Sequence, residues 1–264
     1  MNKDKISLKL VHLYPKEMNI YGDRGNIIAL TKRCDWRGIE IEVINAGLDK
    51  NEIPEGDIYF MGGGQDNDMY LVFDDLVKRK KKFIETEVNK NKVFLLICGG
   101  FQLFGKFFLD SSGRQIDGLG ILSIETQAPG NQVKDRCLGN LLTQIDPDLL
   151  NQIGSAYEEV ISPTLVGFEN HSGQTFSTEE HFETLGRVVY GRGNNPKDLL
   201  EGFRYKNVFA SYSHGPILPK NPHLADFLIY QAMQNKYGDK FEWLQLDDKI
   251  EWQAHLAIKD RLLK

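Results

Sequence analysis

Residues 93–102, Val-Phe-Leu-Leu-Ile-Cys-Gly-Gly-Phe-Gln, decide the fold of this chain and begin the search for its function. Five consecutive apolar residues predict a central parallel strand that is covered on both faces. Cys98 ends this strand, and Gly99 and Gly100 permit a tight turn into a helix. The amides and the dipole of that helix favour a thiolate at Cys98. The pattern predicts a nucleophile elbow, and the alternative is that Cys98 is a small buried hydrophobe.

The composition is that of a soluble globular protein. The chain has 264 residues, 41% hydrophobic and 26% charged, and a net charge of −5, which argues against nucleic acid as a partner. No apolar stretch approaches the roughly 20 residues of a transmembrane segment, and no signal peptide is recognisable. Cys34, Cys98 and Cys137 are an odd number without metal-like spacing. We therefore expect a cytoplasmic protein with neither a disulfide framework nor a bound metal.

The first half of the chain alternates strands and helices. Apolar stretches predict strands at residues 6–13, 39–45, 57–61 and 93–97, and helical patterns follow at residues 27–37, 69–90 and 101–108. This order predicts an α/β fold with a doubly wound, mainly parallel sheet and helices on both faces. The basic run Lys78–Lys82 is interpreted as a solvated helix face, with a substrate or partner role as the alternative.

The second half changes character. Residues 119–183 carry short β-like runs, which we expect to form antiparallel strands added to an edge of the main sheet. A late strand at residues 203–213 is followed by His214, and a helix is predicted from Pro222 to about Lys236. Residues 240–264 predict a terminal helical tail that packs on the core or contacts a partner. The whole chain, residues 1–264, is predicted to form one domain.

Three groups of residues outside the elbow are candidates for chemistry. Asp23 and Arg24 belong to a polar loop after the first strand, where open α/β sheets build their sites, although turn formation alone also explains such residues. Gly62–Gly64 directly follow a strand, so their backbone amides could approach a ligand or an oxyanion. His214 follows the late strand and is a candidate base for Cys98.

The elbow Cys98-Gly-Gly-Phe-Gln102, the glycine loop Gly62-Gly-Gly-Gln-Asp66 and the segment Ser211-Tyr-Ser-His214 together resemble the class I, triad-type glutamine amidotransferases. Within that class the chain is similar to the cobyric acid synthase-like branch. Residues 14–26, 167–175 and 190–195 more narrowly resemble the glutaminase subunits of bacterial lipid II amidation. The resemblance covers nearly the whole chain.

This resemblance implies a mechanism. Cys98 would attack the side-chain amide of L-glutamine to form a γ-glutamyl thioester, with His214 as the base and then the acid. Gly63, Gly64 and Gly99 are the expected oxyanion-hole donors. Arg136 matches the arginine that holds the glutamine in these subunits, a role suited to its planar guanidinium. Gln102 is expected to support the substrate site by hydrogen bonding.

Two residues depart from the pattern of the class. Leu96 stands where many members have glycine, which predicts a less strained elbow. Pro216 stands where many have the glutamate that orients the histidine, and proline cannot do so. We therefore hypothesise that the orienting carboxylate comes from elsewhere, most plausibly from a partner subunit.

The resemblance also implies a partner. A MurT-like Mur ligase subunit would form a heterodimer with this chain, bind ATP and Mg²⁺, and amidate the D-glutamate α-carboxyl of lipid II with the released ammonia. This chain carries no Gly-Lys-Ser or Gly-Lys-Thr phosphate loop, so no cofactor is expected on it. The alternatives are an amidotransferase for another, cobyrinic acid-type acceptor, a stand-alone cysteine γ-glutamyl hydrolase or peptidase, and a catalytically silent interaction subunit.

Overall fold

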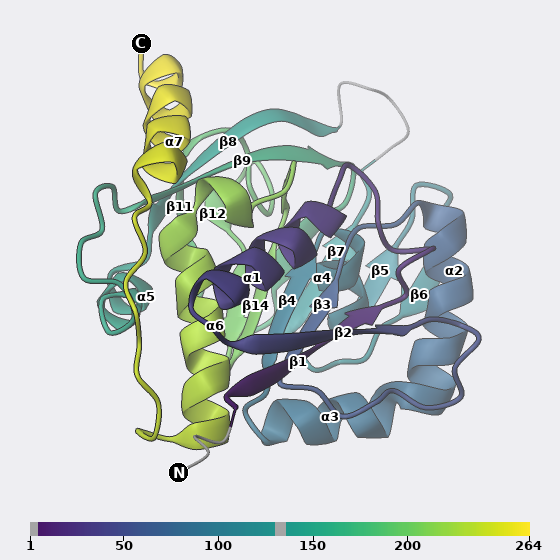
Figure 1. The fold of residues 1–264 in the computed structure, drawn as a ribbon. Helices are drawn as coiled ribbons and strands as arrows, with labels where there is room; N and C mark the ends of the chain where they lie inside the picture. The colour runs from purple at the N-terminus through teal and green to yellow at the C-terminus, as the bar shows by residue number, and fades with distance from the viewer. Residues whose placement is uncertain (1–4, 130–135) are drawn as a thin grey trace.

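A six-stranded sheet is the central element of the fold (Figure 1). The structure is a computed structural model that describes residues 5–129 and 136–264. Its strand order is β13-β14-β4-β3-β1-β2. The strands are β1 (Ser7–Leu13), β2 (Glu40–Ala46), β3 (Ile58–Met61), β4 (Val93–Ile97), β13 (Phe203–Tyr205) and β14 (Val208–Ser211). All neighbours are parallel except β13 and β14. Every residue of β3 and β4 is buried, as expected for strands covered on both faces.

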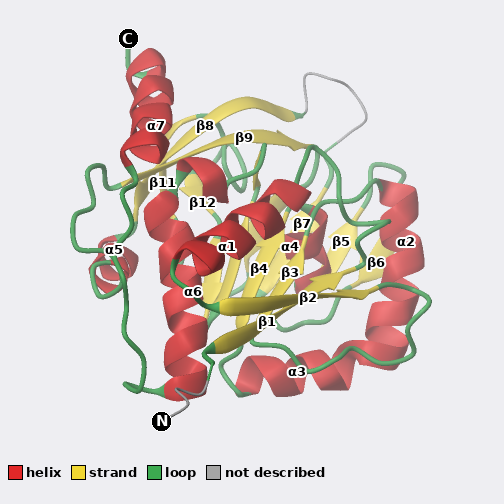
Figure 2. Cartoon of the chain, in the orientation of Figure 1, coloured by secondary structure: helices red, strands yellow, loops and turns green. Residues whose placement is uncertain are grey.

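Helices cover both faces of this sheet (Figure 2). On one face α1 (Arg24–Trp36) packs against α6 (Pro222–Tyr237), and on the other α2 (Asp66–Asp75) contacts α4 (Gly99–Phe104). The predicted doubly wound α/β fold is confirmed. The strand order reverses between β1 and β3, and ligands of such sheets bind at the carboxyl ends of the strands at this point. The loops after β1 and β3 carry Asp23 and Gly62–Gly64.

The strands of residues 119–183 belong to two further sheets, one mixed and one antiparallel, and do not extend the main sheet as expected. Only β13 adds an antiparallel edge to the main sheet. A four-stranded sheet contains β5 (Phe107–Leu109), β6 (Gln115–Asp117), β7 (Ile124–Gln127) and β10 (Gln174–Ser177). A five-stranded sheet contains β8 (Cys137–Ile145), β9 (Thr164–His171), β11 (Gly186–Tyr190), β12 (Leu200–Glu201) and β15 (Ser213–His214). Helix α5 (Pro147–Ile153) follows β8. Because β15 pairs with β9, His214 lies where the main sheet meets the five-stranded sheet.

Two local predictions were wrong. The helix expected at residues 101–108 ends at Phe104, because the chain enters β5 at Phe107. The single strand expected at residues 203–213 is a hairpin of β13 and β14, turned at Lys206, whose φ is +53°. In both places a run of apolar and aromatic residues hides a change of direction, because periodicity alone does not show where a buried run bends.

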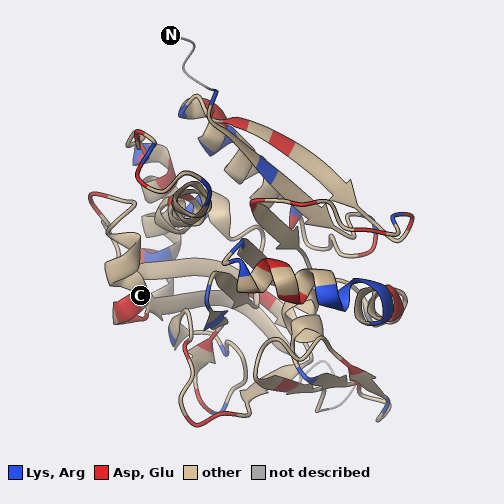
Figure 3. Ribbon diagram, turned by 90° about the horizontal axis from the view of Figure 1, so that it is seen from below, with Lys and Arg blue, Asp and Glu red and all other residues tan. Residues whose placement is uncertain are grey.

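The helix predicted at residues 69–90 is three segments: α2, the π-helical η1 (Leu76–Lys80) and α3 (Lys81–Asn89). The π-helical turn inserts a residue into the helical repeat. Lys80 is thereby buried, and its Nζ donates to the Asp75 carboxylate and, at 3.1 Å, to the Gly47 carbonyl. Lys80 is therefore an exception to the solvated helix face predicted for Lys78–Lys82. Elsewhere basic and acidic positions are interspersed along the ribbon (Figure 3).

The C-terminal tail packs on the core, one of the two expected arrangements. Helix α7 (Lys249–Leu262) buries Trp252 and His255. The residue before it, Asp248, accepts a hydrogen bond from buried Arg33 of α1 at 2.7 Å, and Arg33 also donates to Asp226 of α6. A shared guanidinium therefore joins α1, α6 and the start of α7. No helix in the described ranges has both the length and the apolar character needed to span a membrane.

Candidate active site

Cys98 occupies the predicted elbow between β4 and α4. Its φ of +50° and ψ of −101° are rare for a residue with a side chain. The glycines after it are required by packing: a Cβ at Gly99 would lie 3.0 Å from the Gly64 nitrogen, and one at Gly100 would lie 2.8 Å from the Met61 carbonyl oxygen. The turn is thus strained in this chain with Leu96 in place of glycine; that the strain is lower than in members with glycine stays a prediction.

His214 is buried and is oriented by Asp23. The His214 Nδ1 and the Asp23 Oδ1 lie 3.1 Å apart, and both side chains are fully buried. An ionised carboxylate only accepts, so the proton lies on Nδ1 and Nε2 is the basic atom. No nitrogen or oxygen of the described residues bonds to Nε2, and the Cys98 side chain acts on this ring as a charge and hydrogen-bond partner. Burial lowers the pKa of His214, but the charge of Cys98 and the bond to Asp23 raise it overall. A raised pKa keeps the His214 ring protonated, which suits the later donation of that proton to a leaving group.

The structure offers an orienting carboxylate within this chain, because Asp23 contacts the His214 ring, while the hypothesis of a carboxylate from a partner stays a prediction. Pro216 packs against Gly25, two residues after Asp23. A Cβ on Gly25 would lie 2.3 Å from the Pro216 ring. The glutamate expected near His214 is thus replaced by an aspartate from the loop after β1.

One of the expected oxyanion donors is occupied. The Gly63 N–H donates to Asp23 Oδ2 at 2.8 Å, so it is not available to a substrate. The N–H groups of Gly64 and Gly99 have no acceptor within the described residues. Gly64 and Gly99 lie next to each other. A Cβ added to Gly99 would be only 3.0 Å from the Gly64 nitrogen. The two free amides beside Cys98 are therefore Gly64 and Gly99.

A cavity of about 720 Å³ opens onto Cys98, Gly64 and Gln102. Arg136 also lines this cavity, and its Nη2 donates to Asn170 Oδ1 at 2.8 Å. The guanidinium is thus placed on the wall of the cavity with donors left for an anionic ligand. The Gln102 Nε2 donates to the Tyr212 hydroxyl at 3.1 Å, which fixes the Gln102 side chain beneath the cavity. The cavity lining contains Cys98, Gly64, Gln102 and Arg136 of the residues predicted from the sequence. It does not contain Asp23, Gly63, Gly99 or His214, and Arg24 lines another cavity.

His171 and Tyr212 are site residues that sequence reasoning missed. His171 lines the cavity, and its ring stacks on Tyr212 with centroids 3.7 Å apart. Burial lowers the pKa of His171 to about 3, so the ring is neutral. The Tyr212 hydroxyl also bonds to Thr175 Oγ1 at 2.6 Å. The segment 167–175 was recognised as part of a family pattern, but nothing in its spacing indicates that it stacks on residue 212.

Glu201 anchors the segment that leads to His214. Its Oε1 accepts from the Ser211 hydroxyl at 2.6 Å and from the Tyr212 N–H at 3.0 Å, while Oε2 has no partner among the described residues. Burial raises the pKa of Glu201 from 4.5 to about 7. Glu201 thus binds its proton more tightly in the folded state than in the unfolded state.

We expect Glu201→Gln to flatten the pH dependence of stability. Protonated Glu201 contributes to the free energy of unfolding. This contribution is fully present below pH 4.5 and is lost as the pH rises through about 7. A neutral glutamine does not ionise and avoids this loss. The free energy of unfolding of the variant should therefore rise by up to about 3 kcal/mol relative to the wild type across that range. Thermal unfolding at several pH values measures it. Exposed Glu158→Gln is the control, and an equal slope in the wild type and Glu201→Gln would contradict the argument.

The fold and the site together define a cysteine-dependent glutamine amidotransferase domain. The chain belongs to the CobB/CobQ-like glutamine amidotransferase domain family, whose model matches residues 9–222. A solved glutamine amidotransferase shares the fold with a TM-score of 0.54 at 16% identity, over 84% of this chain and 98% of the other.

Two curated relatives are more similar in sequence. The lipid II isoglutaminyl synthase (glutamine-hydrolyzing) subunit GatD of Streptococcus pneumoniae is 38% identical, over 96% of this chain and 91% of the relative. Subunit GatD of Staphylococcus aureus is 36% identical, over 96% of each chain. Both relatives are thus matched over nearly their full length.

Proposed function

We propose that this chain is the glutamine-hydrolysing subunit of a lipid II isoglutaminyl synthase, as its two GatD relatives are named. The observation that carries the proposal is that Cys98 and Arg136 line one cavity, while Cys98 also acts electrostatically on His214, which Asp23 holds. A thiolate nucleophile, an oriented base and a guanidinium for a carboxylate are the groups that hydrolysis of an amino-acid amide needs.

In the proposed reaction, the Cys98 thiolate attacks the side-chain carboxamide carbon of L-glutamine. The charge on the oxygen is stabilised by the N–H groups of Gly64 and Gly99. His214 Nε2–H then protonates the leaving nitrogen, and ammonia departs as the γ-glutamyl thioester forms. Neutral His214 next takes a proton from water, which attacks the thioester and releases glutamate and the thiolate. Asp23 holds the imidazole through both steps and does not itself transfer a proton.

The ammonia is proposed to pass to a partner, a MurT-like Mur ligase subunit that binds ATP and Mg²⁺ and activates the D-glutamate α-carboxyl of lipid II. This assignment is supported by the names of the relatives and by the match over nearly their full length. Lipid II is then contacted through the partner, and the complex works on the cytoplasmic side of the membrane.

The test is ammonia release from L-glutamine by the purified chain, alone and with its co-purified ligase subunit and ATP. Because the orienting Asp23 belongs to this chain, we expect measurable release by the chain alone, and amidated lipid II only when the ligase subunit is present. Faster hydrolysis of γ-glutamyl peptides than of glutamine would contradict the proposal and favour a stand-alone γ-glutamyl hydrolase.

Arg136→Gln tests the role of the guanidinium. Loss of a charged hydrogen bond to the α-carboxylate costs roughly 1.5–3 kcal/mol, so the KM for glutamine should rise about 10- to 100-fold while kcat changes much less. Steady-state kinetics measures this split. Arg187→Gln on β11, where the side chain is exposed, is the matched control. An unchanged KM would remove Arg136 from the substrate site.

A further inference from the structure

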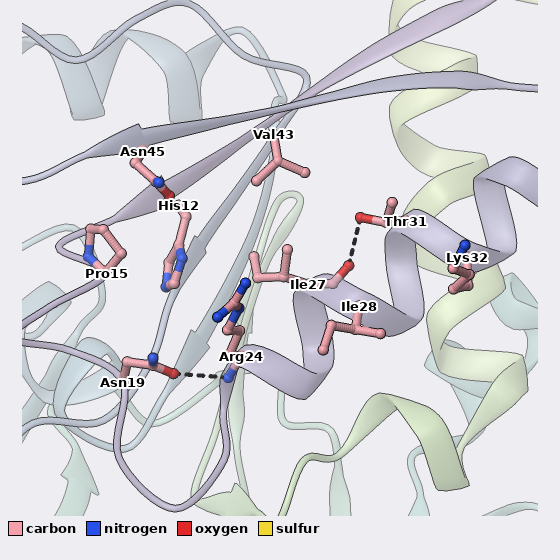
Figure 4. A pocket seen from close by; sticks show the side chains of 10 residues that line it. All are labelled: His12, Pro15, Asn19, Arg24, Ile27, Ile28, Thr31, Lys32, Val43 and Asn45. Atoms are coloured by element: carbon pink, nitrogen blue, oxygen red, sulfur yellow. Dashed lines mark hydrogen bonds between the residues drawn. The ribbon is translucent and has the colours of Figure 1, made fainter.

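A second cavity of about 460 Å³ lies between β1, β2 and the first half of α1, and Cys98 is not among the residues that line it (Figure 4). Its lining contains no aspartate or glutamate. It contains the side chains of Arg24 and Lys32, the amides of Asn19 and Asn45, and the ring of His12. The rest of the lining is largely apolar and includes Ile27, Ile28 and Val43. The proposed glutaminase reaction uses none of these residues.

Arg24 brings an unpaired positive charge to this cavity. Its guanidinium makes no ion pair or hydrogen bond with the described residues, and it extends toward His12 (Figure 4). Lys32 is already paired, since its Nζ lies 3.2 Å from Asp35 Oδ2. The backbone N–H of Arg24 donates to Asn19 Oδ1 at 2.9 Å, which leaves Asn19 Nδ2 as a donor. The cavity thus offers one net positive charge and several neutral donors.

His12 is the second indication of a ligand. Its side chain is buried, with 4% of the residue exposed, and its Nε2 has no hydrogen-bond partner among the described residues. Burial, assisted by the charge of Arg24, lowers the pKa of His12 to about 4, so the ring is neutral and carries one N–H donor. A buried polar atom left without a partner costs free energy, and a bound polar group would recover it.

We infer that this cavity binds a single carboxylate carried on an aliphatic stem, held by Arg24 with His12 and Asn19 as neutral donors. The planar fork of arginine matches a carboxylate, and one unpaired guanidinium balances one negative charge. A phosphate dianion would leave excess charge. Ile27, Ile28 and Val43 provide apolar surface for methylene groups. Two sources supply this chemistry: free L-glutamate, the product of the proposed reaction, and an acidic side chain of a protein.

The position of the cavity connects it to the carboxylate that orients His214. Arg24 directly follows Asp23, which holds His214. A carboxylate bound to Arg24 therefore restrains the same turn that carries Asp23. The inference itself concerns binding and is tested without any glutaminase activity.

The test follows the His12 ring by NMR in the full chain labelled at histidine, with His12→Gln to assign the signal. The chain is titrated with L-glutamate, with N-acetyl-L-glutamate α-amide as a mimic of an acidic side chain, and with inorganic phosphate. We expect at least one carboxylate to shift the His12 signal, with a Kd on the order of 1 mM. The carboxylate with the lower Kd identifies the source of the ligand.

Arg24→Gln should weaken this binding at least about tenfold, and Arg24→Lys should weaken it less, because lysine keeps the charge and loses the fork. Arg136→Gln is the control, since carboxylates also reach the catalytic cavity, and it should leave the His12 response unchanged. Unchanged signals of His223 and His255, which are buried against each other on α6 and α7, report that the Arg24 variants are folded. The inference is overturned if only phosphate shifts His12, if no probe does, or if the carboxylate response persists in Arg24→Gln.

Discussion

Cys98→Ala is expected to abolish release of ammonia from L-glutamine, with a loss of at least about 10⁴-fold in kcat. The variant removes the only thiol that lines the catalytic cavity in the described residues. Without the sulfur no thioester forms, and water must attack the amide directly. The fold should persist, because Cys98 is replaced by a smaller residue at the edge of a cavity. Ammonia release and thermal unfolding measure the two effects.

The matched control is Cys34→Ala in α1. Cys34 is fully buried, and burial raises its pKa to about 12, so it is not a nucleophile. This variant should lose stability, by roughly 1–2 kcal/mol, without a large change in kcat. Mass spectrometry of acid-quenched reactions should find a γ-glutamyl adduct on Cys98 of the wild type. An active Cys98→Ala protein would remove the thioester mechanism.

Asp23→Asn is expected to lower kcat by about 10²- to 10⁴-fold, with a much smaller change in KM. Both Asp23 oxygens accept hydrogen bonds, Oδ1 from His214 and Oδ2 from Gly63. Asparagine has only one acceptor oxygen, so one of the two donors loses its partner, or the imidazole changes tautomer and Nε2 is no longer basic. Steady-state kinetics of the lone chain measures this effect.

The pH profile of Asp23→Asn distinguishes orientation of the base from a general loss of structure. The bond to Asp23 raises the pKa of His214, so its removal lowers that pKa. The imidazolium is then lost at lower pH, and the alkaline limb of kcat/KM should move to lower pH. Asp74→Asn on the exposed side of α2 is the control. If Asp23→Asn keeps wild-type kinetics, Asp23 does not orient His214, and a carboxylate of a partner subunit is the remaining candidate.

The sequence predicted β1 to β4 of the main sheet well, because these strands are short runs that end in glycine or polar loops, but it did not separate β13 from β14. The run Val93–Ile97 and the turn at Cys98 are examples, and both lie where the pattern places them. The arrangement of residues 119–183 was harder to predict. Short β-like segments show neither their partners nor their sheet, because pairing depends on contacts between distant parts of the chain.

The sequence predicted most residues of the candidate site but not the hydrogen bonds that join them. Cys98 and His214 were chosen from the sequence, and Asp23 was noted in a loop expected to reach the same edge. The bond between Asp23 and His214 joins residues 191 positions apart, and no local pattern carries that information. Gly63 was misassigned for the same reason, since its amide serves Asp23 and not a substrate.

The two bonds of Asp23 have a consequence for how this enzyme turns on and off. One carboxylate sets both the angle of the proton carrier and the path of the loop that leads to the Gly64 amide. Any event that displaces the segment between β1 and α1 therefore disturbs acid–base transfer and charge stabilisation simultaneously. Such an event should then weaken both functions together, and its effect on kcat should exceed that of losing either function alone.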